Sequence, residues 1–336
     1  MVRLAIIGCG GMAATHRAQF GELGSRLKVT AAVDLDLNRA REAARAVGAP
    51  HALADFRQAL PYADAVLIAL PHHLHHPVGM ECLAAGKHVL MEKPLANSER
   101  ECLDLIAAAQ AHKAVLMVGY IMRYHPLVVR LKELIDEGKC GEVFHLSIWT
   151  EQYTRVAEGH WAHKAATLGG GQLFSHGCHY IDLLLWYLGN PVEGCHTGTN
   201  FGTPWMEREG TSDVFIKFES GAVGYHGGTW GAKGSRLGYA FHAHGTEGML
   251  ELDFAKGRLS FHCDGKEETL AESETGMKHA ARQMAHFLDC IQKGAKPVTD
   301  GPGSLQGLRV IWRLYEAERN RTVADLRGLG LSAPWR

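Results

Sequence analysis

The stretch that decides the fold is Ile6-Ile7-Gly8-Cys9-Gly10-Gly11-Met12-Ala13, near the start of the chain. It has the pattern G-x-G-x-x-A and lies between an apolar run at 4–7 and a helical pattern at 11–23. In such a turn the first glycine permits a tight bend, the second lets a pyrophosphate touch the backbone, and a small third residue lets helix and strand pack closely. The free N–H groups at the start of the helix favour negative charge. The stretch therefore predicts a strand, a phosphate-binding turn and a helix.

An acidic residue follows where such a unit needs one. Asp34 ends the second apolar strand, 24 residues past Gly10. At that point a carboxylate accepts hydrogen bonds from the hydroxyls of the adenosine ribose. We therefore predict that Gly8, Gly10, Gly11, Met12 and Asp34 bind NAD. NADP is less favoured because its 2′-phosphate would face the carboxylate.

Composition excludes several classes of protein. The 336 residues hold 35 Lys and Arg against 36 Asp and Glu, so no basic field is available for nucleic acid. No run reaches the roughly 18 to 20 apolar residues that span a bilayer, and no signal peptide is visible, so we expect no membrane partner and a cytoplasmic location. The eight cysteines are scattered without C-x-x-C spacing, which argues against disulfides and thiolate zinc sites.

The rest of the chain reads as two domains. Up to residue 120, short apolar runs alternate with helical patterns, which predicts a doubly wound parallel sheet and hence an α/β fold. The pattern Ser98-x-x-Glu101 predicts a capping box for a helix over 98–112. From 142 to 263 alternating strands separated by glycine turns predict a mainly antiparallel sheet, with helices near 177–188, 277–291 and 305–315. We place the domain boundary between 1–121 and 122–336.

A second motif resembles a known family. Ala85-Gly86-Lys87-His88-Val89-Leu90-Met91-Glu92-Lys93-Pro94 is similar to the signature of the glucose-fructose oxidoreductase / inositol dehydrogenase / rhizopine-catabolism (Gfo/Idh/MocA) family. Further matches in the same order run over nearly the whole length: Leu70-Pro71-x-x-x-His75, Arg123-Tyr124-His125-Pro126, Gly141-Glu142-Val143, Gly169-Gly170-Gly171 leading to His179-x-x-Asp182, and Pro297-Val298-Thr299.

The resemblance implies a fold and an activity. It implies an N-terminal Rossmann domain and a C-terminal α/β domain with an open, mainly antiparallel sheet, often an oligomerisation face, and hence a homo-oligomer (dimer or tetramer). It implies hydride transfer between NAD(P) and a carbon of a small-molecule polyol, sugar, cyclitol or glycoside.

Motif positions also imply roles for individual residues. Glu92 and Lys93 would lie beside the nicotinamide, and the catalytic Lys93 would reach the reacting oxygen; the Lys93–Pro94 bond is a candidate for the cis form. The segment that contains Leu70, Pro71, His72 and His75 would line the nicotinamide ribose. His179 falls on the catalytic histidine position.

One position departs from the family pattern. The family usually has Asp four residues before the catalytic histidine, and this chain has Ser175. A serine hydroxyl can hydrogen-bond a substrate but cannot carry charge at neutral pH. We therefore expect no carboxylate beside His179 that would raise the pKa of its imidazole. His176, one helical turn earlier, is expected to face the same site. With Arg123, Tyr153 and Trp161, the side chains of Ser175 and His176 make up the predicted substrate contacts.

The 21 histidines raise the question of a metal. Four of them fall within 72–76, and His160/His163 and His176/His179 are spaced three apart. No acidic or thiolate ligand accompanies them in the sequence, so polar loop lining is the favoured interpretation and no metal site is predicted.

Three functions are open at this point. The first is an NAD-dependent dehydrogenase for a secondary alcohol of a sugar, cyclitol or glycoside. The second is a redox-neutral enzyme whose tightly held NAD oxidises the substrate transiently before an elimination or epimerisation. The third is a regulator that binds the cofactor without turnover, against which the retained Lys93 and His179 argue.

Overall fold

A computed structural model describes residues 1–273 and 276–336. The chain forms two compact units. The first unit comprises Met1–Ile121 and Lys278–Pro302, and the second unit comprises Met122–Met277 and Gly303–Arg336. No helix in the described parts of the chain is long and apolar enough to cross a membrane.

The first unit is built on a six-stranded parallel sheet in the order β3-β2-β1-β4-β5-β6. Its strands are β1 (Val2–Ile7), β2 (Leu27–Val33), β3 (His51–Leu53), β4 (Ala65–Ile68), β5 (His88–Met91) and β6 (Leu116–Val118). Its main helices are α1 (Gly11–Gln19), α2 (Leu37–Val47), α3 (His75–Ala84), α4 (Glu99–Ala111) and α8 (Ala280–Lys293). This confirms the predicted doubly wound sheet.

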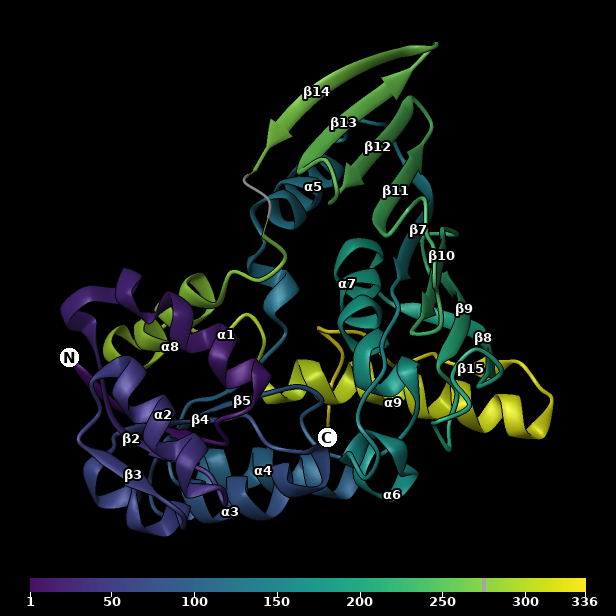
Figure 1. The fold of residues 1–336 in the computed structure, drawn as a ribbon. Coiled ribbons are helices and arrows are strands. Elements are labelled where there is room, and N and C mark those ends of the chain that lie inside the picture. The colour runs from purple at the N-terminus through teal and green to yellow at the C-terminus, as the bar shows by residue number, and fades with distance from the viewer. Residues whose placement is uncertain (274–275) are drawn as a thin grey trace. The chain divides into compact units, whose positions relative to one another are not determined.

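Helices cover both faces of this sheet. The helices α3 and α4 pack together, whereas α1 packs with α2 and α8, and Figure 1 shows the two groups on opposite sides of the strands. All residues of β4 are buried, as expected for a strand covered on both faces. Ser98 and Glu101 form the predicted capping box. The helix predicted over 11–23 is shorter: α1 ends at Gln19 and short 3₁₀ turns follow over Phe20–Arg26, interrupted at Gly24.

The second unit carries a nine-stranded sheet in the order β14-β13-β12-β11-β7-β10-β9-β8-β15. Its strands are β7 (Val143–Glu151), β8 (Pro191–Thr199), β9 (Thr211–Phe218), β10 (Val223–Thr229), β11 (Tyr239–Gly245), β12 (Gly248–Asp253), β13 (Arg258–Cys263), β14 (Lys266–Glu272) and β15 (Ala324–Asp325). The helices are α5 (Pro126–Asp136), α6 (Ala165–Leu168), α7 (Cys178–Leu188) and α9 (Gly301–Asn320). The pair β7 and β10 is parallel, and the remaining pairs are antiparallel, so the sheet is mixed but mainly antiparallel as predicted.

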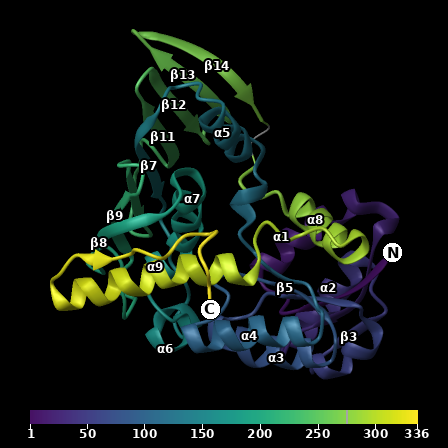
Figure 2. The same cartoon turned by 180° about the vertical axis from the view of Figure 1, so that it is seen from behind.

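Helices cover one face of this sheet. The helix α5 packs on β12, β13 and β14, and α7 packs on β10. Seen from behind, α9 runs along the β8 end of the same sheet (Figure 2). The side chains of Leu146, Ile148 and Leu252 point to this covered face and are fully buried. On the opposite face Phe215 remains 48% exposed.

The segment Lys278–Pro302 belongs to the first unit, although the sequence-based division placed it in the second domain. Thr299 pairs with the edge strand β6: Val118 N donates to Thr299 O at 2.8 Å, and Thr299 Oγ1 donates to Val118 O at 2.8 Å. This pairing covers an otherwise open sheet edge. The domain boundaries 1–121 and 122–336 stay a prediction.

Candidate active site

Four strands of the first unit end in register. In the parallel pairs, Ile7 lies beside both Val33 and Ile68, and Ile68 lies beside Met91. The next residue of each strand is therefore Gly8, Asp34, Ala69 or Glu92, and all four lie at one edge of the sheet. In a doubly wound sheet this carboxyl edge is where ligands bind. A cavity of about 280 Å³, lined by Leu116 at the start of β6, the end of α4 and 297–302, is at the opposite edge and is assigned no function.

Gly8 makes the turn after β1 possible. Its φ of +89° favours glycine, and a Cβ there would lie 2.3 Å from the Ala69 main-chain oxygen. Gly8 N also donates to Val33 O at 2.8 Å. Any other residue would therefore force the neighbouring strand away.

The helix α1 begins with groups suited to an anion. A Cβ added to Gly10 or Gly11 would meet no atom within 4 Å, so the surface above them is open. The N-cap residue is Gly10, and no side chain caps the helix. Its first N–H groups therefore need acceptors from outside the helix, and a pyrophosphate can provide them. Together with Met12 in the first turn, these residues fit a bound dinucleotide.

The carboxylate of Asp34 is held by the backbone. Its Oδ2 accepts from Cys9 N and its Oδ1 accepts from Asp36 N, both at 2.9 Å. Arg39, the nearest candidate partner for a 2′-phosphate in the sequence, lies 3.5 Å from Asp36 in an exposed ion pair. Asp34 thus stands fixed at the carboxyl end of β2, as the sequence predicts.

Glu92 and Lys93 follow β5. Glu92 is 5% exposed, and its Oε1 lies 2.9 Å from Nε2 of the fully buried His16. Burial acts to raise the pKa of Glu92, but the hydrogen bond and charge of His16, helped by Lys93, hold the pKa below its ordinary value. A second carboxylate oxygen accepts from Lys93 N at 3.3 Å. The Lys93–Pro94 peptide bond is cis.

His75 ties two turns together. Its Nδ1 lies 2.8 Å from Pro94 O and its Nε2 lies 2.9 Å from Leu70 O. It is fully buried, and burial lowers the pKa of its imidazole. A neutral imidazole has one N–H and donates to one of these two carbonyl oxygens, so the ring lies between the backbone at Leu70 and the backbone at Pro94. His72 is 4% exposed and its ring centre lies 5.7 Å from that of His75.

Lys278 is a cation that the sequence analysis did not select. Its Nζ lies 3.2 Å from Met12 Sδ, in the first turn of α1. Burial lowers the pKa of this amine, and the charge of Lys93 acts in the same direction against that of Glu92. No local pattern marks this lysine because the contact joins residues 266 apart in the chain.

Three of the predicted residues of the second unit, Ser175, His176 and His179, share one helical stretch. A π-helical turn, Leu173–Gly177, carries Ser175 and His176 and leads directly into α7, which carries His179. Such turns occur often at functional sites. Ser175 is 5% exposed and His179 is 7% exposed. The rings of His176 and His179 lie 6.2 Å apart, so the structure brings these two imidazoles together.

Arg123 forms a buried ion pair with Asp182 on α7. Its Nε donates to Asp182 Oδ2 at 2.7 Å and its Nη2 donates to Asp182 Oδ1 at 3.3 Å. The guanidinium also lies 4.2 Å from the ring centre of Trp186. These contacts anchor α7, and the predicted contact of Arg123 with substrate stays a prediction.

The two selected aromatic residues lie in different surroundings. Trp161 packs against a buried cluster that includes Ala162 and Trp230, whereas Tyr153 is 54% exposed. Further aromatic residues lie near His176, among them Tyr239, whose Oη lies 3.3 Å from His176 Nε2, and Tyr180, whose ring centre is 5.2 Å away. Tyr239 lies far along the chain from His176, so no sequence spacing marks it.

Over residues 1–273 and 276–336, no group of three or more His, Cys, Asp or Glu side chains is arranged to hold a metal ion. The paired histidines of the sequence instead make other contacts. His160 Nδ1 accepts from Ala162 N at 3.2 Å, and the ring of His163 lies 5.3 Å from that of Trp205.

Comparisons with known proteins agree with this geometry. Residues 2–120 match the model of an oxidoreductase family with an NAD-binding Rossmann fold, and residues 128–251 match the Gfo/Idh/MocA C-terminal domain. Inositol 2-dehydrogenase 2 of Saccharopolyspora erythraea is 28% identical over 66% of this chain and 65% of its own length. Levoglucosan dehydrogenase of Pseudarthrobacter phenanthrenivorans is 28% identical over 65% of this chain and 63% of its own length. The matched stretch thus spans less than two thirds of these two relatives.

Solved structures share the fold over nearly the whole chain. The aldose-aldose oxidoreductase of Caulobacter crescentus, complexed with glycerol, has a TM-score of 0.87 at 24% identity and covers 97% of this chain and 99% of its own. A levoglucosan dehydrogenase complexed with NADH has a TM-score of 0.87 at 21% identity, with 97% and 99% covered. The two matched domain models together cover more than half of the chain and show that it belongs to the Gfo/Idh/MocA oxidoreductase family.

Proposed function

We propose that this protein is an NAD-dependent dehydrogenase that acts on a secondary alcohol of a sugar, cyclitol or glycoside. One observation carries the proposal. The register of the parallel strands places the turn at Gly8, the fixed carboxylate of Asp34 and the Glu92–Lys93 pair at the same edge of the sheet. That edge therefore carries groups that can bind a dinucleotide and the amine of Lys93, which can act on a substrate oxygen.

The cofactor would be held by the first unit. The open backbone at Gly10 and Gly11 would receive the phosphates, and the carboxylate of Asp34 would accept from the ribose hydroxyls. The ammonium of Lys278, beside Met12, adds positive charge near the phosphates. The turn at Leu70, Pro71 and His72 would border the nicotinamide end of the same edge, with His75 fixing the backbone.

Bound NAD supplies a nicotinamide that exchanges a hydride with the carbinol carbon. For this chain the remaining task is to bind the alcohol and move its hydroxyl proton. We assign Lys93 to the substrate oxygen, where its amine can donate a hydrogen bond and stabilise the charge that develops as the proton leaves. Glu92, bonded to His16 and to Lys93 N, holds the backbone of Lys93 in place.

We assign the proton itself to His179. An imidazole exchanges protons near neutral pH, which suits an alcohol oxidation. Ser175 and His176, on the same helical stretch, would contact other hydroxyl groups of the substrate. Tyr153 and Trp161 are proposed as further sugar contacts because aromatic faces stack on the apolar faces of sugar rings.

The proposed substrate class follows the named relatives, an inositol dehydrogenase and a levoglucosan dehydrogenase, both of which act on ring polyols. The test is to mix the purified protein with NAD or NADP and a panel of inositol, levoglucosan, glucose and xylose, and to follow the absorbance of the reduced nicotinamide. Formation of NADH with a panel member supports the proposal. Cofactor that copurifies and resists dialysis, without net NADH formation, would point to redox-neutral chemistry instead.

We also propose a homo-oligomer. The face of the second unit's sheet opposite the helices presents Phe215 and Trp149 beside Tyr225, with ring centres 4.8 Å apart in both pairs. Phe215 is the exposed member of this group, and exposed aromatic side chains are enriched at protein interfaces. A Phe215→Lys variant should lower the mass measured by light scattering; an unchanged mass would place the interface elsewhere. The cytoplasmic location stays a prediction, with which the eight free thiols accord.

A further inference from the structure

The helical stretch that carries His176 and His179 begins with four main-chain N–H groups that the helix itself cannot satisfy. These are the amides of residues 171–174. The first hydrogen bond within the helix runs from Ser175 N to Gly171 O at 2.9 Å. Because residues 171–174 are buried, these amides need acceptors from other parts of the fold.

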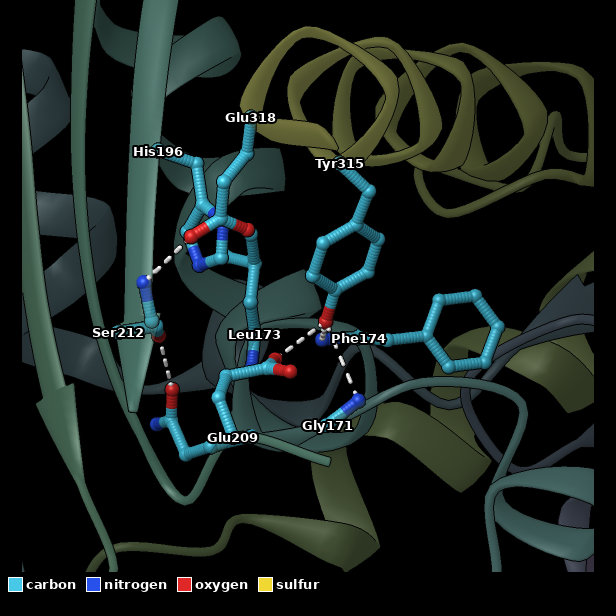
Figure 3. Close-up of polar contacts among 10 residues, drawn as sticks. Gly171, Leu173, Phe174, His196, Glu209, Ser212, Tyr315 and Glu318 are labelled. Carbon is cyan, nitrogen blue, oxygen red and sulfur yellow. Dashed lines mark hydrogen bonds and ion pairs between the residues drawn. The ribbon is translucent and has the colours of Figure 1, made fainter. Parts of the chain in front are cut away.

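Tyr315, on α9, provides acceptors for the first and last of these amides. Its Oη accepts from Gly171 N at 3.1 Å and from Phe174 N at 3.2 Å. Figure 3 shows the phenol of Tyr315 pointing from α9 to the start of the helix. One hydroxyl oxygen therefore joins both ends of the first turn.

Glu209 provides acceptors for the two amides between them. Its main-chain oxygen accepts from Gln172 N at 2.7 Å, and its Oε1 accepts from Leu173 N at 3.4 Å. Tyr315 Oη donates to the same Oε1 at 2.5 Å. All four amides therefore donate to the side chains of Tyr315 and Glu209 or to the Glu209 main-chain oxygen. The two side chains are also hydrogen-bonded to each other.

The protonation of Tyr315 and the charge of Glu209 are compatible with these hydrogen bonds. Burial raises the pKa of Tyr315 well above its ordinary value, and the adjacent Glu209 adds to the effect, so the hydroxyl stays protonated and donates. A carboxylate at the start of a helix interacts favourably with the helix dipole. Burial also raises the pKa of Glu209, against the hydrogen bond from Tyr315.

Two glycines leave room for the carboxyl group. A Cβ on Gly171 would lie 2.2 Å from both carboxylate oxygens of Glu209. A Cβ on Gly198 would lie 2.7 Å from Glu209 Cγ. The glycine before the helix therefore has a specific task, which is to let Glu209 approach the first turn.

A second acid, Glu318, holds the strand residues that pack beside Tyr315 and Glu209. Glu318, one turn after Tyr315 on α9, accepts from Gly198 N at 2.8 Å and lies 2.9 Å from His196 Nδ1. The ring of His196 packs edge-on against Tyr315, with ring centres 5.1 Å apart. These contacts fix the phenol on the side of β8, the strand that carries His196 (Figure 3).

We propose that Tyr315 and Glu209 are positioning residues that set where His176 and His179 stand for proton transfer. The inference rests on the proposed function for its effect on rate. The pair fixes the first turn, and the π-helical turn that follows leads without interruption into the residues that carry the two imidazoles. A shift of the first turn is therefore passed along the helix to both rings.

The test compares Tyr315→Phe with the wild-type protein. The variant keeps the ring and loses the oxygen. We expect faster hydrogen exchange at the amides of 171–174 and shifted imidazole NMR signals of His176 and His179. With whichever polyol of the panel gives turnover, kcat should fall by about tenfold or more, while the Kd for NAD stays within about twofold of wild type because the dinucleotide groups lie in the first unit.

A second pair of variants separates the cap from loss of packing. Glu209→Gln keeps an acceptor oxygen and should retain most of the activity that Glu209→Ala loses. The matched control is Thr30→Val, which removes a buried hydroxyl of the first unit that donates to Leu4 O at 3.2 Å. It should lower the Tm by a similar amount without moving the two imidazole signals.

The results that overturn the proposal are clear. If Tyr315→Phe lowers the Tm as Thr30→Val does but leaves the imidazole signals and kcat unchanged, the pair is structural support alone. Absence of turnover by the wild-type protein with every polyol would instead contradict the proposed function. Hydrogen exchange and NMR need no turnover, so they decide the positioning role even then.

Discussion

The carboxylate of Asp34 should set the preference for NAD over NADP, and Asp34→Asn tests this with little change in shape. Asp34 accepts hydrogen bonds from Cys9 N and Asp36 N. Asparagine keeps one carbonyl oxygen as an acceptor and removes the charge. The turn should therefore survive while the repulsion of a 2′-phosphate is lost.

The size of the effect can be worked out from Coulomb's law. Two unit charges 4 Å apart interact by about 4 kcal/mol near a protein surface, and a phosphate monoester carries about −1.5 to −2 charges at neutral pH. Asp34 is partly exposed, so solvent screening reduces the repulsion to about 1.5 to 3 kcal/mol. The ratio of the NADP and NAD dissociation constants should therefore fall by about 10- to 150-fold in Asp34→Asn.

The assay is a titration of protein fluorescence or calorimetry with each dinucleotide at low and moderate salt. The wild-type ratio should shrink as salt rises, and the variant ratio should hardly change. Asp36→Asn is the matched control, because it removes an equal charge two residues away, where Asp36 caps α2. The reasoning is refuted if Asp34→Asn leaves the ratio unchanged, or if both variants change it equally.

Four further outcomes are expected. Lys93→Met should lower the turnover rate by about 10² to 10⁴ while the Kd for NAD changes only a few-fold; near wild-type turnover would remove this amine from the mechanism. His179→Ala should lose most activity, and Ser175→Asp should move the acid limb of the oxidation profile to higher pH; a profile that stays in place would mean that the proton leaves by another route. Burial lowers the pKa of the His226 imidazole to about 3, whereas its pKa in the unfolded chain is about 6.5. As the pH falls below about 6.5, the unfolded chain therefore binds a proton that the folded protein does not bind. Stability should decline from there toward pH 3, and His226→Gln should flatten the decline in Tm. Lys278→Gln should weaken NAD binding and reduce its salt dependence; an unchanged Kd would place this amine away from the phosphates.

Features that depend on neighbouring residues could be predicted from the sequence. The turn at Gly8, the acid at Asp34 and the capping box at Ser98 each follow from a short pattern with one physical reason. The strand register then brings Gly8 and Asp34 together without further information, because parallel strands align at their carboxyl ends.

Features that join distant segments could not be predicted. Tyr315 and Glu209 are 106 residues apart, and neither belongs to a motif. Lys278 reaches Met12 only because its segment returns to the first unit. The helix α5 was a missed signal rather than a hidden one: Pro126 stands at its start, where a proline is favoured, and apolar residues follow at helical spacing.

The most direct test of the central claim is to follow the hydrogen that leaves the substrate. A polyol that gives turnover is prepared with deuterium at the oxidised carbon, and the reduced dinucleotide is isolated and analysed by mass spectrometry. The proposed function predicts that the deuterium appears in NADH, one atom for each product formed, and that Lys93→Met slows its transfer. NAD that binds but gains no deuterium, with the label found in water or retained in the product, would contradict hydride transfer to NAD as the net reaction.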